Sequence, residues 1–356
     1  MKKVLITGIC GFVGSTLAKS WLVAEPGLEL YGIDNFIRPG SEHNRIELQK
    51  LGIKLLHGDI RSASDFELLP KVDWVIDAAA NPSVLAGVDG QTSSRQLVEH
   101  NLLGTVNILE YCKRCNAGFI LISTSRVYSI SRLSDIIVEP VGKAFRLASH
   151  QALPAGLSDA GVSELFSTAP PISLYGSSKL ASEALALEYG EAFDFPVWIN
   201  RCGVFAGAGQ FGRPDQGIFT FWINSWLRRR PLVYIGFGGN GCQVRDAMHP
   251  RDLIPLLQMQ TAPGTSTPVK IVNLGGGMDN AMSLAELSSW CKRRFGDHMV
   301  GSNPTIRRFD VPWLVMDSTL AGDVWGWRPE TNMEQILEEI ANHAEKNPHW
   351  LELSGL

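Results

Sequence analysis

The chain has 356 residues, of which 45% are hydrophobic, and a net charge of -4. It can therefore bury a complete core, and its slight acidic excess argues against binding to nucleic acid or to an anionic membrane surface. No apolar run reaches the ~20 residues of a membrane helix, and Met1 leads directly into a strand pattern, so we expect a cytoplasmic protein without membrane contact.

Short apolar runs alternate with helical patterns in the first half of the chain. Each run is continuously hydrophobic, which is typical of strands buried on both faces of a parallel sheet. The predicted strands are residues 4–7, 30–34, 54–57, 74–78 and 119–124. Right-handed crossovers between them give an α/β fold with a doubly wound parallel sheet of the Rossmann type.

Two long helices are predicted over residues 93–115 and 175–193. Between them, residues 129–174 form a long connection without a clear period, and loops of that length are usually functional or mobile.

After Phe205 the alternation of apolar runs and helical patterns becomes less regular. Glycine and proline become frequent, and tryptophans occur at Trp313, Trp325 and Trp327. We interpret this part as a smaller α/β lobe over the carboxyl ends of the strands, where such sheets bind ligands. The predicted Rossmann domain covers residues 1–204, with later segments such as 240–275 returning to it. The substrate-binding lobe is expected to take up most of residues 205–356.

A glycine-rich loop follows the first predicted strand. Gly8, Gly11 and Gly14 open a helix, and glycines in this setting let the backbone approach a pyrophosphate at the helix start. Asp34 ends the second strand, where a carboxylate accepts hydrogen bonds from ribose hydroxyls and repels a 2'-phosphate. The pattern favours NAD, and Arg38 leaves NADP open.

Asp59 ends the third strand. It is a candidate for binding the adenine amino group, and equally for capping a turn.

Tyr175 and Lys179 lie four residues apart and therefore on one helix face. A neighbouring ammonium and the positive nicotinamide ring would favour the phenolate and make Tyr175 a base near neutral pH. Thr124, at the end of a buried strand, is expected to orient the reacting hydroxyl, and Ser123 could share that task. Either hydroxyl could instead bond to backbone.

At this point the chain resembles the extended short-chain dehydrogenase/reductase family of NAD-dependent nucleotide-sugar epimerases and dehydratases. The likeness covers nearly the whole length. It is carried by Thr7-Gly8-x-x-Gly11-Phe12-x-Gly14-Ser15, Gly58-Asp59-Ile60-Arg61, Asn101-Leu102-Leu103-Gly104-Thr105, Ser123-Thr124-x-x-Val127-Tyr128, Tyr175-x-x-x-Lys179 and Val272-Asn273-Leu274-Gly275-Gly276.

The resemblance implies an enzyme with Thr124, Tyr175 and Lys179 as catalytic residues. Together with the glycine loop, it implies an NAD site formed by Gly8, Gly11, Phe12, Val13, Gly14, Asp34, Asn35, Arg38, Asp59, Ile60, Ala78, Ala79, Ala80, Asn101, Ser123, Tyr175, Lys179 and Arg201. It also implies a homodimer through helices 93–115 and 175–193, although ordinary packing explains their apolar faces equally well.

Within the family, the chain most resembles the CDP-tyvelose (CDP-paratose) 2-epimerases. The likeness rests on Asp34-Asn35 with Arg38, on Gln210-Phe211 with Asp215-Gln216-Gly217, and on Gly239-Asn240-Gly241 with Gln243-Val244-Arg245-Asp246 and His249. It implies that Gln210, Gln216, Gln243 and Arg245 bind the substrate.

The chain departs from those epimerases at two arginine positions. Gly209 and Pro312 stand where the relatives usually carry arginine. Arg307 or Arg308 could replace the missing guanidinium on the diphosphate, because arginine suits phosphate oxygens bidentately.

Ser125 and Arg126 stand where sugar dehydratases carry a carboxylate after the threonine. The absence of that carboxylate favours transient oxidation and re-reduction of a sugar hydroxyl. The likeness to the 2-epimerases favours C2 of a CDP-sugar. A UDP-sugar 4-epimerase, a dehydrogenase or dehydratase with net turnover, and a non-catalytic NAD-binding protein are the alternatives.

The cysteines and histidines lack the spacing of a metal site. Only Cys112 and Cys115 lie close together, which is half of a structural zinc site, so we expect no bound metal.

Overall fold

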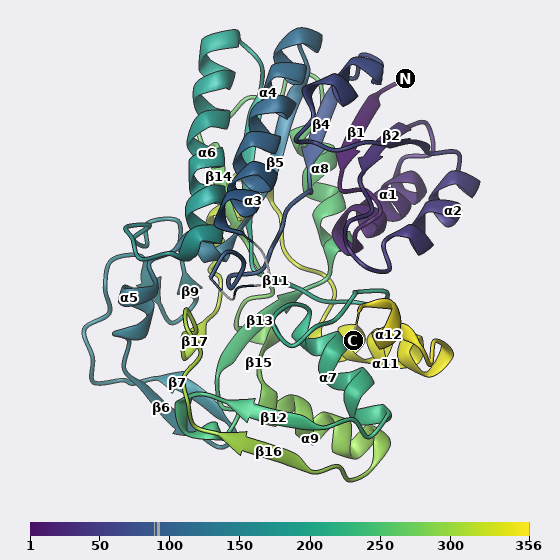
Figure 1. Cartoon of the computed structure of the whole chain (residues 1–356). Coiled ribbons are helices and arrows are strands. Elements are labelled where there is room, and N and C mark those ends of the chain that lie inside the picture. The colour runs from purple at the N-terminus through teal and green to yellow at the C-terminus, as the bar shows by residue number, and fades with distance from the viewer. Residues whose placement is uncertain (89, 91–92, 356) are drawn as a thin grey trace.

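The computed structural model describes residues 1–88, 90 and 93–355. Within these residues, seven parallel strands form one sheet in the order β14-β10-β5-β4-β1-β2-β3 (Figure 1). Their bounds are β1 Lys3–Thr7, β2 Glu29–Asp34, β3 Lys54–His57, β4 Trp74–Asp77, β5 Gly118–Thr124, β10 Val197–Cys202 and β14 Ile271–Leu274. The predicted Rossmann fold is therefore confirmed.

Each face of this sheet is covered by its own apolar cluster. Val4 and Ile6 of β1 pack into one cluster, whereas Leu5 between them packs into the other. Successive strand residues point to opposite faces, so burial of both faces requires the continuous hydrophobic runs seen in the sequence. The helices α1 Phe12–Ala24, α2 Glu42–Lys50, α4 Gly104–Cys115, α6 Ser173–Phe193 and α8 Ile254–Gln260 accompany the sheet.

The helix expected over residues 93–115 is built from three pieces. Ser93 caps α3 Ser94–Val98 in a capping box, a π-helical turn covers Glu99–Leu103, and α4 follows directly. Such π turns often occur at functional sites. The second long helix, α6, begins at Ser173, two residues earlier than predicted, so Tyr175 lies in its first turn.

The connection over residues 129–174 is more ordered than expected. It contains α5 Ile130–Ser134, the hairpin of β6 Val138–Val141 and β7 Ala144–Leu147, and the short pair β8 Leu157–Ser158 and β9 Gly161–Val162. Its apolar side chains are buried against residues far along the chain, such as Val244 and Trp313. Elements this short leave no readable period in the sequence.

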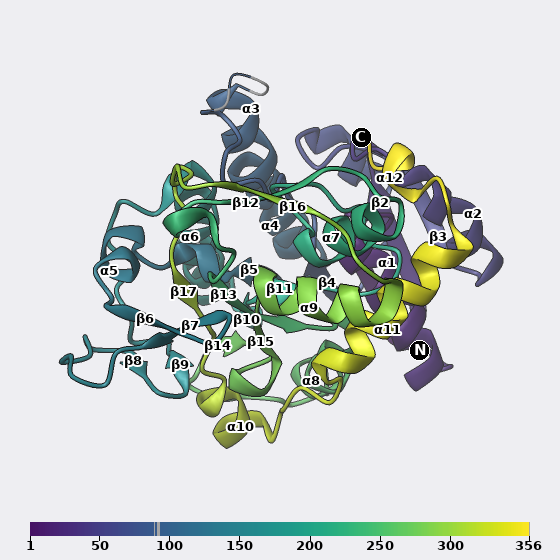
Figure 2. The ribbon, with the colours of Figure 1, turned by 90° about the horizontal axis from the view of Figure 1, so that it is seen from below.

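The remaining elements lie mainly at the carboxyl ends of the sheet strands, as Figures 1 and 2 show. They comprise α7 Ile218–Leu227, α9 Leu284–Phe295, α11 Met333–Lys346 and α12 Trp350–Leu353, with β11 Val204–Phe205, β12 Leu232–Ile235, β13 Val244–Met248, β15 Ala281–Ser283, β16 Val300–Asn303 and β17 Trp313–Leu314. A separate apolar cluster unites α7, α9 and α11.

Residues 319–327 return to the seven-stranded sheet before the chain enters α11. Trp325, at the end of α10 Thr319–Trp325, meets Trp198 of β10 edge to face, and Trp327 is buried in the same cluster. These tryptophans therefore do not pack within the smaller lobe as the sequence suggested. The exact division at residues 204 and 205 stays a prediction. Across the described residues, no helix is both long and apolar enough to cross a membrane.

Candidate active site

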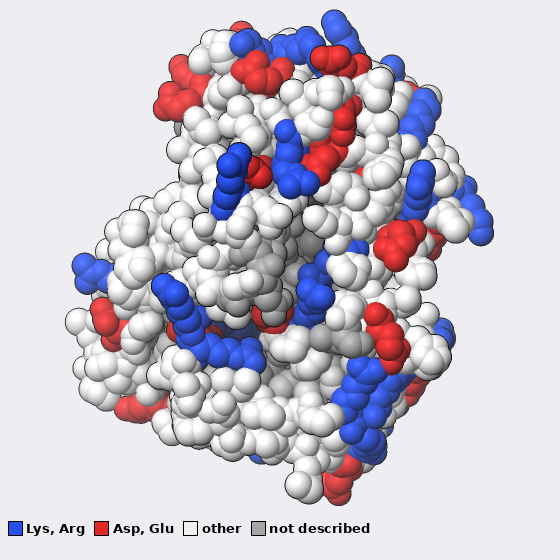
Figure 3. All heavy atoms as spheres, in the orientation of Figure 1, with Lys and Arg blue, Asp and Glu red and all other residues white. Residues whose placement is uncertain are grey.

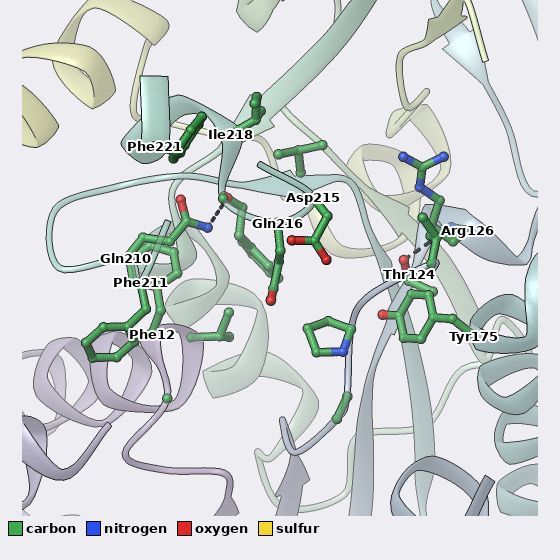
Figure 4. Close-up of a pocket in the computed structure, with 18 of the residues that line it drawn as sticks. Phe12, Thr124, Arg126, Tyr175, Gln210, Phe211, Asp215, Gln216, Ile218 and Phe221 are labelled. Carbon is green, nitrogen blue, oxygen red and sulfur yellow. Dashed lines mark hydrogen bonds between the residues drawn. The ribbon is translucent and has the colours of Figure 1, made fainter. Parts of the chain in front are cut away.

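A cleft of about 740 Å³ lies where the carboxyl ends of the sheet strands meet the smaller lobe. The glycine loop, the ends of β2, β4 and β5, and the first turn of α6 line one side. The loop of residues 210–217, together with residues 243–245 and 307–310, lines the other. Figure 3 shows this face hollowed between the two parts of the molecule, and Figure 4 looks into the cleft.

The glycine loop has the geometry expected of a dinucleotide site. Gly8 has φ +61°, and a Cβ on Gly14 would lie 2.4 Å from the Gly8 carbonyl oxygen. The loop therefore excludes side chains where a pyrophosphate approaches. No side chain caps the start of α1 at Gly11, which leaves its first amides available to an anion.

Asp34 is fixed beside this loop. Its two oxygens accept hydrogen bonds from the backbone N–H groups of Cys10 (2.9 Å) and Phe36 (2.8 Å). Burial nevertheless raises its pKa. The carboxylate lines the cleft and retains lone pairs for ribose hydroxyls. These features fit NAD.

Tyr175 and Thr124 face the same cleft from α6 and from the end of β5 (Figure 4). Burial raises the pKa of Tyr175 to about 12, opposed by a hydrogen bond with Thr124 and by the positive charge of Arg126. The surroundings that the protein itself provides therefore favour the neutral phenol, and its activation by an ammonium together with a nicotinamide ring stays a prediction.

Lys179 lies one turn behind Tyr175 and is only 2% exposed. Burial lowers its pKa, whereas the carboxylates of Asp77 and Glu183 act in the opposite direction. Its ammonium therefore interacts electrostatically with acids below the cleft. The positive charge of Arg126, in contrast, acts on the phenol and lowers the pKa of Tyr175.

Twelve of the proposed NAD-site residues line the cleft, in addition to Tyr175 and Ser123. They are Gly8, Gly11, Phe12, Val13, Gly14, Asp34, Asn35, Arg38, Ile60, Ala78, Ala79 and Ala80.

Four other predicted residues lie outside the cleft lining. The carboxylate of Asp59 is engaged by Asn35 and Arg61, which hold its pKa far below its usual range despite burial. Asn101 bonds to Asn81 and Ser178, and Lys179 is buried as described. Arg201 is an interior ion-pair partner of Glu183, so a contact with cofactor has no support from its position.

The predicted substrate residues converge from several loops. Gln210 donates to the Phe205 carbonyl, and Gln216 accepts from Arg38 across the cleft (2.8 Å). Arg307 donates to the Pro214 carbonyl, which ties the lobe to the same loop.

Gln243 and Arg245 extend this side of the cleft. Gln243 donates to the Ile235 carbonyl, while its buried Oε1 has no hydrogen-bond partner among the described residues. Arg245 is held by Asp310 at 2.8 Å and by the Val311 carbonyl. All five predicted substrate residues line the cleft.

Arg126 lines the cleft, which was not expected from the sequence. This residue was considered only as the absence of a carboxylate, yet its side chain lies next to Thr124. Its position two residues after the strand-end threonine was the available signal. No cluster of His, Cys, Asp or Glu suited to a metal occurs among residues 1–88, 90 and 93–355.

Residues 4–275 match the family model of the NAD dependent epimerase/dehydratase family. The CDP-paratose 2-epimerase of Salmonella typhi is 27% identical over 350 residues, covering 95% of this chain and 98% of the relative. UDP-glucuronate 4-epimerase 1 of Arabidopsis thaliana is also 27% identical, covering 95% of this chain and 75% of the relative.

The fold is likewise similar to solved structures. The UDP-glucuronic acid 4-epimerase of Bacillus cereus, in complex with UDP-glucuronic acid and NAD, superimposes with a TM-score of 0.76 at 26% identity. The match covers 97% of this chain and 99% of the Bacillus chain.

Proposed function

The chain belongs to the NAD-dependent epimerase/dehydratase family, and from this premise we propose that it inverts one carbon of a nucleotide sugar, with C2 of a CDP-sugar favoured. The observation that carries the proposal is the meeting of Tyr175 and Thr124 with the glycine loop in one cleft. The similarity to the Salmonella 2-epimerase over nearly the whole of both chains supports the choice of sugar and carbon.

In this proposal, Thr124 orients the reacting hydroxyl and Tyr175 takes its proton. Bound NAD would supply the hydride acceptor and donor for this redox step, and its positive ring would favour the phenolate of Tyr175. Tyr175 returns the proton once the sugar presents its other face. The positions of Ser125 and Arg126 supply no carboxylate for elimination of water, which favours epimerisation over dehydration.

The proposed NAD site comprises the cleft-lining residues from the glycine loop to Ala80 described above, apart from Arg38, whose guanidinium is bonded to Gln216 and to the Phe211 carbonyl. Lys179 lies behind this site, one helical turn after Tyr175. We propose Gln210, Gln216, Gln243, Arg245 and Arg307 for the substrate. A homodimer through α4 and α6 stays a prediction.

The second candidate is a UDP-sugar 4-epimerase. It is favoured by the similarity to the UDP-glucuronate 4-epimerases of Arabidopsis and Bacillus. Both candidates use the same Tyr175 chemistry and differ in nucleotide and carbon.

Tyr175→Phe tests the chemistry because it removes only the phenolic oxygen. We expect the purified variant to retain NAD and to lose turnover of CDP- or UDP-sugars, followed by NMR of the sugar. Leu174→Ala, on the exposed side of the same turn, is the matched control. Unimpaired turnover by Tyr175→Phe would refute the role of Tyr175, and steady accumulation of absorbance at 340 nm would identify a net dehydrogenase instead. Bound NAD with no turnover of any nucleotide sugar by the wild type would favour the non-catalytic alternative.

A further inference from the structure

Arg126 occupies a fixed position at the sugar end of the cleft. It lies in the 3-10 turn Ser125–Val127 that follows β5, and its backbone N–H donates to the Thr124 hydroxyl (3.2 Å). Figure 4 shows its guanidinium on the far side of Thr124 from Tyr175. The side chain is therefore anchored beside the residue that is proposed to hold the reacting hydroxyl.

The guanidinium of Arg126 is unpaired. It makes no hydrogen bond or ion pair with any residue that the structure describes, although the side chain is partly buried. Arg38 and Arg245 line the same cleft and differ in this respect. Arg38 is bonded to Gln216 and to the Phe211 carbonyl, and Arg245 is bonded to Asp310 and to two backbone carbonyls.

The groups that act electrostatically on Arg126 are the Asp310 carboxylate and the Tyr175 phenol, and Arg126 in turn acts on the Arg245 guanidinium, which also faces Asp246. Asp310 is already held by Arg245 and by the Val311 N–H. The nearby carboxylate is thus taken up by Arg245, and a partly buried cation without a partner of its own is costly.

We propose that Arg126 binds an oxyanion of the nucleotide sugar and thereby helps to determine which sugars the cleft accepts. The proposal rests on the proposed nucleotide-sugar function. The fork of N–H donors of a guanidinium fits the two oxygens of a carboxylate or of a phosphate. A carboxylate on the sugar or an oxygen of the diphosphate could supply this chemistry, and the latter would offset the arginines missing at Gly209 and Pro312.

The test is calorimetric titration of the NAD-loaded protein with CDP, UDP, CDP-glucose, UDP-glucose and UDP-glucuronic acid. Wild type is compared with Arg126→Gln, with Arg126→Lys, and with Arg132→Gln as a control on the neighbouring helix α5, where the side chain is exposed. We expect Arg126→Gln to weaken binding of the ligand that carries the recognised oxyanion about 10- to 100-fold. Arg126→Lys should lose less because it keeps the charge, and Arg132→Gln should match wild type.

The pattern of losses identifies the source of the oxyanion. A loss for UDP-glucuronic acid alone identifies a sugar carboxylate, whereas an equal loss for the nucleotides and all the sugars identifies the diphosphate. Wild-type affinity of both Arg126 variants for every ligand that the wild type binds would overturn the inference and leave the proposed function standing. Failure of the wild type to bind any of these ligands would instead overturn the proposed function, and the inference with it.

Discussion

The Arg201 guanidinium holds the Glu183 carboxylate beside β5, with Nη2 2.6 Å from Oε2 and Nε 3.1 Å from both oxygens. Both side chains are almost fully buried, at 5% and 2% exposed. The same carboxylate accepts a hydrogen bond from Ser123, at 2.5 Å. The ion pair therefore connects α6 and β10 to the strand end that presents Thr124.

Glu183→Gln should destabilise the protein strongly, because it leaves the buried Arg201 charge without a counter-ion. We expect the free energy of unfolding to fall by about 3–5 kcal/mol, measured by urea denaturation. Glu188→Gln, at an exposed position of the same helix, should change it by less than about 0.5 kcal/mol. Equal stability of the two variants would show that the pair contributes no more than a surface charge.

This pair also illustrates what the sequence could and could not predict. The Rossmann sheet was predictable because its central strands are buried on both faces and because the glycine loop leaves no room for side chains at Gly8 and Gly14. Thr124 was expected at the end of a buried strand and Tyr175 on a helix, and both line one cleft at the carboxyl ends of the strands.

The partners of the charged side chains could not be predicted from the sequence. Arg201 has Glu183 as its partner, and Arg38 bonds to Gln216, 178 positions away. Such pairs depend on tertiary packing and not on local spacing. The same holds for residues 129–174, whose short strands are stabilised by apolar contacts with distant residues.

Gly14→Ala should disrupt the cofactor loop. The added Cβ would lie 2.4 Å from the Gly8 carbonyl oxygen and 2.7 Å from Ile9 Cα, and both are backbone atoms that cannot rotate away. We expect loss of most of the NAD that copurifies with the protein, together with a destabilisation of about 1–3 kcal/mol. In Gly27→Ala the new Cβ meets nothing within 4 Å, so this variant should retain its NAD. Cofactor released by heat and measured by mass spectrometry distinguishes the two, and a full complement of NAD in Gly14→Ala would contradict the prediction.

His249 should make stability depend on pH. Burial and the charge of Arg251 lower its pKa to about 3, and Nδ1 accepts a hydrogen bond from the Arg251 N–H at 3.1 Å. Glu339 lies 3.4 Å from Nε2, but its carboxylate is also paired with Arg251. The ring therefore stays neutral in the folded protein near pH 7.

The direction of this pH dependence follows from proton uptake by the unfolded chain. As pH falls below about 6.5, the unfolded chain binds a proton at this ring that the folded protein does not bind. The stability present above pH 6.5 is lost towards pH 3, by at most about 1.4 kcal/mol per pH unit. His249→Asn keeps an acceptor for the Arg251 N–H and should flatten the profile of unfolding free energy between pH 6.5 and 4. The exposed His150→Asn should leave that profile unchanged, and a steep profile in His249→Asn would assign the effect to other groups.

Arg38→Ala should weaken substrate binding more than chemistry. Arg38 spans the cleft from the β2 side to the loop of residues 210–217, donating to Gln216 Oε1 at 2.8 Å and to the Phe211 carbonyl at 2.5 Å. Its loss frees this loop, while Tyr175 and Thr124 on the opposite side keep their positions. We therefore expect KM for the nucleotide sugar to rise about tenfold with kcat changed by less than about twofold.

The hydrogen bonds of Arg38 also affect whether the protein binds NAD or NADP. Because Gln216 and Phe211 occupy the guanidinium, and Asp34 lies beside the glycine loop, we expect the wild type to retain NAD and no NADP. Arg45→Ala is the control, since Arg45 is exposed and packs over the Phe36 ring outside the cleft. If Arg38 instead binds a 2'-phosphate, NADP will copurify with the wild type, and Arg38→Ala will lose that cofactor and kcat with it. Steady-state kinetics together with mass spectrometry of the released nucleotide separate these two roles, because loss of a clamp on the loop raises KM at full cofactor content, whereas loss of a cofactor contact lowers cofactor content and turnover together.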